Sequence, residues 1–123
     1  MITLYGIPNC DTVKKARTWL SEQQIDFVFH DFKKQGLPQD AARLWLDTLG
    51  RDVVINRQGT TWRKLTAEQQ AAITSDEAAL ALITELPSLI KRPVLSAGEL
   101  LLIGFKPEHY AQHLPALQQA ATR

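Results

Sequence analysis

Residues 2–32, ITLYGIPNCDTVKKARTWLSEQQIDFVFHDF, decide the fold. Residues 2–5 are apolar and β-prone, and a glycine, a proline and an asparagine then end the run. From Asp11 apolar residues recur at helical spacing, and residues 26–32 form a second β-prone segment about one helix length after the first. A strand, a helix and a strand in so short a span predict a βαβ unit with parallel strands and a right-handed crossover.

The middle of the chain is predicted to be helical. Apolar residues recur at helical spacing over residues 38–49, and Thr66 and Ser75 each have the sequence context of a helix start. Residues 56–64 are polar and are predicted to form a loop.

The end of the chain returns to β structure. Residues 93–95 and 100–104 flank Ser-Ala-Gly-Glu and predict an antiparallel hairpin. Pro107 suits the first turn of a last helix, which Pro115 is expected to kink or restart.

These segments predict an α/β fold in one domain over residues 1–123. A small mixed sheet is expected from residues of about 1–35 and 88–120, with residues 36–87 as a helical insertion that forms a cap beside it. A chain of 123 residues with a hydrophobic fraction of 45% is long enough to fill one core.

Composition excludes several classes of protein. Fourteen Lys and Arg against thirteen Asp and Glu give a net charge of +1, so no nucleic-acid partner is expected. The start carries no basic segment, and the longest apolar runs fall far short of the roughly 18 residues of a membrane span. We therefore expect a cytoplasmic protein without a membrane partner, and we expect a monomer.

Cys10 is the only cysteine and the strongest chemical signal in the sequence. It follows the first predicted strand and begins the first predicted helix, where open α/β sheets place ligands. Free amide hydrogens and the helix dipole favour a thiolate there, Lys14 and Lys15 add positive charge, and Asp11 opposes it. A reactive thiol is favoured over the alternative, a small apolar filler.

The position three residues after Cys10 is Val13, so the chain has no Cys-x-x-Cys pair. A thiol cycle must therefore use an outside thiol. Glutathione is the abundant cytosolic candidate, and a mixed disulfide with it can be resolved by a second glutathione or a redoxin.

Other polar residues give weaker signals. Arg57, Arg92 and Lys106 are cations on predicted loops, and they matter only if they converge on Cys10. Three histidines lack a supporting acidic motif, so neither a metal site nor a bound cofactor is expected.

Several segments together carry a family pattern, namely residues 4–12, 14–16, 56–57, 59–65, 90–93 and 104–107. They resemble the arsenate reductase (ArsC) family, in particular its YffB-like branch, whose relatives include the Spx transcriptional regulators. The resemblance runs from about residue 2 to residue 110.

The resemblance implies a thioredoxin-like fold with a helical insertion. In the family the thiol of the Asn-Cys loop is the nucleophile, which corresponds here to Cys10 after Asn9. Thr12 and Lys14, at the start of the predicted helix, are expected to support the thiolate.

The family's reductases bind their oxyanion with three arginines, and the resemblance implies that Arg57 and Arg92 match two of them. Arg92 precedes Pro93, which matches the cis-proline typical of this fold. Lys106 stands at the third position. Lysine keeps the charge but lacks the planar guanidinium fork that matches an oxyanion, which argues against arsenate as the substrate. A point charge can still bind a glutathione carboxylate.

The leading prediction is an enzyme, a glutathione-dependent thiol oxidoreductase in which the Cys10 thiolate attacks a mixed disulfide. Arg57, Arg92 and Lys106 would orient glutathione or hold the thiolate, with glutathione as co-substrate and glutaredoxin or a thiol protein as possible partner. Two alternatives remain open: arsenate reduction with glutathione and glutaredoxin as reductants, and an Spx-like regulator that binds RNA polymerase. Val13 in place of a second cysteine argues against the redox switch of many Spx-type regulators.

Overall fold

A computed structural model describes residues 1–122 of the chain. The chain divides into two compact units. One comprises Met1–Gln35 and the segment from Arg92 onward, and we call it the sheet unit. The other, Gly36–Lys91, is the helical unit.

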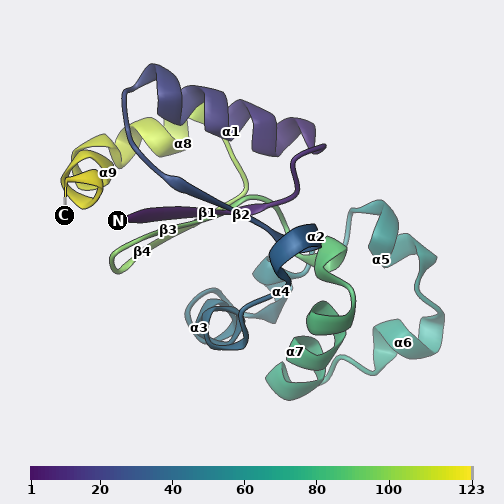
Figure 1. The fold of residues 1–123 in the computed structure, drawn as a ribbon. Helices are drawn as coiled ribbons and strands as arrows, with labels where there is room; N and C mark the ends of the chain where they lie inside the picture. Colours follow the sequence, from purple (N-terminus) through teal and green to yellow (C-terminus); the bar gives the residue numbers. More distant parts are fainter. Residues whose placement is uncertain (123) are drawn as a thin grey trace. The chain divides into compact units, whose positions relative to one another are not determined.

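The sheet unit is built on a four-stranded mixed sheet with the strand order β2-β1-β3-β4 (Figure 1). β1 runs parallel to β2, and the pairs β1–β3 and β3–β4 are antiparallel. The predicted βαβ unit, hairpin and fold class are confirmed. The strands are β1 (Ile2–Gly6), β2 (Val28–Asp31), β3 (Val94–Ala97) and β4 (Leu100–Ile103).

The second strand is shorter than predicted over residues 26–32. It ends at Asp31, and Phe32 begins the short helix α2 (Phe32–Gln35). The Asp31 carboxylate accepts a hydrogen bond from the Lys33 amide at 2.9 Å, and the Gln35 side chain accepts one from the Asp31 amide at 3.1 Å. These local bonds favour a helical turn over continued strand pairing.

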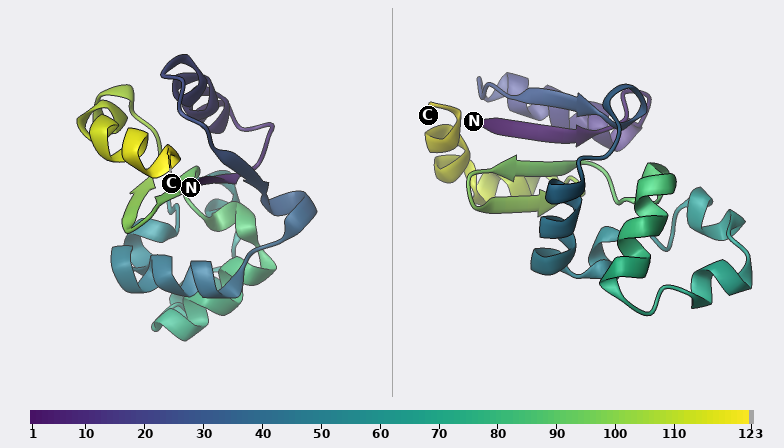
Figure 2. Two further views of the ribbon diagram at one scale, coloured as in Figure 1. Left: turned by 60° about the vertical axis from the view of Figure 1, so that its left-hand side comes forward. Right: turned by 60° about the horizontal axis from the view of Figure 1, so that its bottom comes forward.

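Three helices supply the rest of this unit: α1 (Asp11–Glu22), α8 (Pro107–Gln112) and α9 (Leu114–Ala121). α1 and α8 lie over one face of the sheet (Figure 1, Figure 2). Pro115 lies in the first turn of α9, which confirms the predicted restart. The core between helices and sheet consists of Ile2, Leu4, Ala16, Leu20, Ile25, Leu95, Ala97, Leu102, Tyr110, Leu117 and Ala120.

The close approach of β1 to α1 requires a glycine at position 6. A Cβ atom built on Gly6 would lie 2.8 Å from a methyl carbon of Val13, which is fully buried in the first turns of α1. The absence of a side chain therefore lets the helix begin directly beside the end of the strand. The loop that carries Cys10 joins these two elements.

The helical unit contains five α-helices among its described residues, and α3 packs against both α4 and α7. Helices begin after Thr66 and Ser75, as predicted. Thr66 and Gln69 form a capping box, and the Ser75 side chain accepts a hydrogen bond from the Ala78 amide at 3.1 Å. The elements are α3 (Gln39–Leu49), α4 (Arg51–Val54), α5 (Thr60–Lys64), α6 (Ala67–Ala71), α7 (Asp76–Glu85) and the 3₁₀ helix η1 (Pro87–Leu89).

The prediction of a loop over residues 56–64 is wrong at its second half, because residues 60–64 form α5. None of the residues of α5 is buried. A short exposed helix has no apolar face, so its sequence lacks the periodicity that identifies longer helices.

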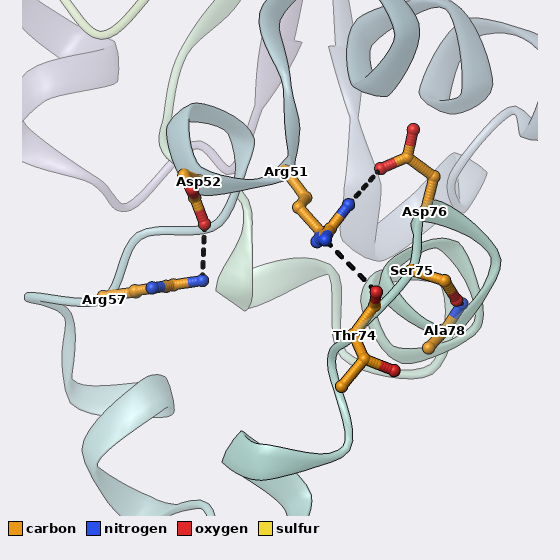
Figure 3. Close-up of polar contacts among 7 residues, drawn as sticks. All are labelled: Arg51, Asp52, Arg57, Thr74, Ser75, Asp76 and Ala78. Atoms are coloured by element: carbon orange, nitrogen blue, oxygen red, sulfur yellow. Dashed lines mark hydrogen bonds and ion pairs between the residues drawn. The ribbon is translucent and has the colours of Figure 1, made fainter.

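Arg51 joins two helices of this unit (Figure 3). Its Nη1 atom lies 3.1 Å from Oδ1 of Asp76 at the start of α7, and its Nη2 atom donates a hydrogen bond to the Thr74 carbonyl oxygen at 3.2 Å. The guanidinium thereby links α4 to the loop before α7.

Within residues 1–122, no helix is both long and apolar enough to cross a membrane.

Candidate functional site

Cys10 is the N-cap residue of α1, as the sequence predicts. Its backbone is extended, with φ −105° and ψ 125°, and its carbonyl oxygen accepts the Lys14 amide at 2.9 Å. The side chain is half-buried. Since the first amides of a helix have no partner within the helix, they are available to stabilise a negative charge on the sulfur.

Arg92 is the side chain that the fold brings to this thiol. β3 runs antiparallel to β1, with Val94 opposite Tyr5, so the residues just before β3 lie at the carboxyl end of β1. The Arg92 guanidinium donates a hydrogen bond to the thiol and adds its positive charge. Arg92, one of the cations on predicted loops, therefore lies beside Cys10.

Opposing effects act on the pKa of the thiol. Burial, the largest effect, raises the pKa of Cys10. Val13 through its amide and Arg92 through its guanidinium lower the pKa, and the Thr12 amide makes a smaller contribution of the same sign. Together these groups hold the pKa of Cys10 below its ordinary value. The Cys10 side chain makes no regular capping hydrogen bond to the first turn of α1.

The peptide bond between Arg92 and Pro93 is cis, as the resemblance implies. The Pro93 carbonyl oxygen accepts a hydrogen bond from the Gly104 amide at 2.9 Å. This bond connects the segment before β3 to the segment after β4, which leads to Lys106.

The remaining predicted site residues of the sheet unit are exposed or half-buried. Asn9 and Lys14 are exposed, and Thr12 is half-buried in the first turn of α1. Lys106 is exposed at the N-cap of α8. None of their side chains is among the described groups that lower the pKa of the thiol.

Arg57 belongs to the helical unit and already has two partners there. Its Nη2 atom lies 2.6 Å from Oδ1 of Asp52 (Figure 3), and its guanidinium carbon lies 5.3 Å from the centre of the Trp62 ring. The side chains of Arg57 and Asp52 are 47% and 79% exposed. An anion that binds Arg57 must therefore compete with a carboxylate.

Three groups that act on the predicted site residues, each within its own unit, are absent from the sequence prediction. The Val13 amide acts on the thiol, Gly6 permits the close approach of strand and helix, and Asp52 neutralises Arg57. A glycine at the end of a predicted strand is a usable signal, whereas an exposed ion pair leaves no sequence pattern. Among residues 1–122, no cluster of three or more His, Cys, Asp or Glu side chains could hold a metal ion.

Comparison with known proteins assigns this chain to a family. The sequence profile of the ArsC family matches residues 5–113. The chain belongs to the ArsC family. The predicted resemblance to this family is thereby confirmed, and the cysteine loop and Arg92 lie within the matched residues.

Two solved structures and one sequence relative illustrate the range of this ArsC family member's neighbours. A protein named YffB has 46% sequence identity and a TM-score of 0.86, and the match covers 91% of this chain and 97% of that one. An arsenate reductase (ArsC) related protein from Brucella melitensis has 42% identity and a TM-score of 0.73, with 92% and 93% covered. The global transcriptional regulator Spx 1 of Lactococcus lactis is 32% identical over 117 residues, with 94% and 90% covered.

Proposed function

We propose that this ArsC family member is a thiol oxidoreductase that acts on mixed disulfides of glutathione. The observation that carries the proposal is the contact between Arg92 and Cys10, which with the helix amides holds the pKa of the thiol below its ordinary value. The thiolate is the attacking form of cysteine, so a lowered pKa increases the reactive fraction near neutral pH.

The chemical cycle needs only one cysteine in the protein. The Cys10 thiolate attacks the glutathione sulfur of the mixed disulfide, a Cys10–glutathione disulfide forms, and the substrate thiolate leaves and takes a proton. The thiolate of a second glutathione then attacks the glutathione sulfur held on Cys10. Oxidised glutathione is released and the Cys10 thiolate is restored, so each sulfur that is reduced is matched by one that is oxidised.

Arg92 and Lys106 have different roles in this proposal. Arg92 holds the Cys10 thiolate and stabilises it again when the sulfur becomes the leaving group. Lys106, exposed at the start of α8, offers a point charge to a glutathione carboxylate. Asn9, next in sequence to Cys10, offers an exposed side-chain amide. Pro93 and Arg57 stay candidates for substrate and anion binding on the resemblance alone.

Turnover of a small mixed disulfide tests the proposal. The substrate is the mixed disulfide of glutathione and 2-mercaptoethanol, with reduced glutathione as the second substrate. The wild-type protein should release oxidised glutathione catalytically, and Cys10→Ser, which keeps the size of the side chain, should abolish release. Equal turnover by the wild type and Cys10→Ser would end the proposal.

Arsenate reduction is the second candidate, and similarity to an arsenate reductase related protein favours it. In this reaction the Cys10 thiol would displace water from arsenate. Glutathione would then attack the Cys10 sulfur of the adduct, which releases arsenite and leaves a Cys10–glutathione disulfide, and a second glutathione would restore the thiol and leave as oxidised glutathione. Lys106 at the third cation position lacks the bidentate fork that suits an oxyanion. Consumption of glutathione that depends on arsenate distinguishes this candidate from the first.

A regulatory role is the third candidate, because one relative is named a global transcriptional regulator. Val13 occupies the position where a second cysteine would be needed for a Cys-x-x-Cys switch. Co-purification with RNA polymerase, together with no turnover of any disulfide, would favour this role over the enzymatic ones.

A further inference from the structure

A groove runs along α1 beside the candidate site. It has a volume of about 330 Å³ and lies within the sheet unit, between α1 and the start of α8. It is separate from the groups that contact the thiol. Its lining includes Lys14, Lys15, Thr18, Trp19, Glu22 and Phe105.

Two aromatic rings form the floor of the groove and pack against a third ring in the core. Trp19 and Phe105 are half-buried, and both rings meet the ring of Tyr110 edge-on, with centroid distances of 5.6 and 4.7 Å. Tyr110 is fully buried in the core. A floor fixed in this way can accept an apolar side chain without first being ordered, which favours binding.

The charges of the groove are divided along α1. Lys14 and Lys15 are exposed near the end of the helix that carries Cys10, and Glu22 is exposed at the other end. Lys106 adds a further exposed cation next in sequence to Phe105. The groove is therefore positive towards the thiol, apolar in the middle and negative at its far end.

We propose that this groove docks an extended segment of the protein whose mixed disulfide Cys10 attacks. A carboxylate of the segment lies against Lys14 and Lys15, and a large apolar side chain rests on Trp19 and Phe105. That the docked protein carries the mixed disulfide rests on the proposed function. Binding in the groove itself requires no reaction at the sulfur.

The length of α1 sets the spacing of such a segment. At a rise of 1.5 Å per residue, Trp19 lies about 13 Å along α1 from Cys10. An extended chain covers about 3.3 Å per residue, so its apolar residue lies about four residues from the modified cysteine. The carboxylate falls between them, about two residues from the cysteine.

A peptide pair tests this order. The first peptide carries a cysteine, a glutamate two residues later and a leucine four residues later, with glycine and serine elsewhere. In the second peptide lysine replaces the glutamate and alanine replaces the leucine. As mixed disulfides with glutathione, the first should have a kcat/KM about tenfold higher, equivalent to about 1.4 kcal/mol. Equal values would overturn the docking proposal.

Protein variants localise the effect. Thr18→Arg fills the groove and Lys15→Glu reverses the charge at its positive end, so both should remove the advantage of the first peptide. The matched control is Lys34→Glu, the same charge change at an exposed residue of α2 outside the groove lining. It should keep the advantage. Loss of the advantage in Lys34→Glu to the same degree would show a nonspecific charge effect and contradict the proposal.

A binding experiment separates docking from catalysis. Peptides with serine in place of cysteine are titrated into Cys10→Ser protein and followed by amide chemical shifts. Shifts confined to the groove residues, for the first peptide and not the second, support docking even if no disulfide is turned over and the proposed function fails. Turnover of small disulfides without such shifts would sink the docking proposal and leave the proposed function intact.

Discussion

The Arg92 guanidinium donates a hydrogen bond to the Cys10 thiol, although the two residues lie 82 positions apart in the sequence. The pairing of β1 with β3 brings them together, because Val94 is opposite Tyr5 in the sheet. A half-buried charge-assisted contact of this kind is sensitive to the loss of one partner. The relationship therefore predicts how the thiol responds when Arg92 changes.

Replacement of Arg92 should raise the pKa of Cys10. Arg92→Ala removes both the hydrogen bond and the charge, and a hydrogen bond to a charged group is worth about 1.5–3 kcal/mol, so we expect a rise of about one pKa unit or more. Arg92→Lys keeps the charge and should give a smaller rise. The pH dependence of Cys10 alkylation measures both shifts. Lys91→Ala, which removes the exposed charge next in sequence, is the control. If Lys91→Ala raised the pKa of Cys10 as much as Arg92→Ala does, a specific contact with Arg92 would be contradicted.

A side chain at position 6 should disturb the start of α1. Gly6→Ala places a methyl group 2.8 Å from a Val13 methyl carbon, and overpacking of this kind costs about 1–3 kcal/mol in the free energy of unfolding. Val13→Ala makes room for the new methyl group, so the double variant should be more stable than the sum of the single effects. Urea denaturation of the four proteins measures this coupling. Strict additivity would show that the two side chains do not collide.

Removal of the Tyr110 hydroxyl should not destabilise the protein. The hydroxyl oxygen is buried and has no hydrogen-bond partner among residues 1–122, and burial raises the pKa of Tyr110 far above its ordinary value. An unpaired buried polar group is unfavourable, so Tyr110→Phe should be neutral or stabilising by up to about 1 kcal/mol.

The same residue predicts a pH effect. Because folding raises the pKa of Tyr110, its contribution to stability is present below about pH 10 and is lost as the pH rises above that value. Tyr110→Phe should lose less stability than the wild type between about pH 9 and pH 11 in urea denaturation. An equal loss in both proteins would indicate that the hydroxyl is hydrated in solution.

The sequence predicts the position of Cys10 more fully than its surroundings. The break at Gly6 and Pro8 and the helical spacing after Asp11 are local patterns, so the strand, the loop and the helix start can be derived from adjacent residues. The approach of Arg92 depends on which strands become neighbours. Strand pairing is a long-range property, and only the resemblance to a family indicates it at the level of sequence.

Arg57 shows a second limit of prediction. Its family pattern indicates an anion-binding residue, but its charge is paired with Asp52 on the surface. Exposed ion pairs contribute little to stability and require no particular sequence context. The helices α4 and α5 escape prediction for a related reason, since short segments lack a full apolar stripe.

Asp52→Asn tests what the ion pair does. Both side chains are largely exposed, so the free energy of unfolding should change by less than about 1 kcal/mol. If Arg57 binds a glutathione carboxylate, loss of the competing carboxylate should lower the KM for reduced glutathione. Asp76→Asn, which breaks the similar exposed pair with Arg51, should leave this KM unchanged. A higher KM in Asp52→Asn would remove Arg57 from the list of glutathione-binding residues.

The most direct test of an activated thiol is the rate of Cys10 alkylation as a function of pH, with mass spectrometry after incubation in oxidised glutathione as the companion measurement. We expect a midpoint below the reference value of about 8.5 and one glutathione adduct per chain, because Arg92 and the helix amides stabilise the thiolate. A midpoint at or above about 8.5 without an adduct would identify Cys10 as an inert thiol and rule out an activated nucleophile.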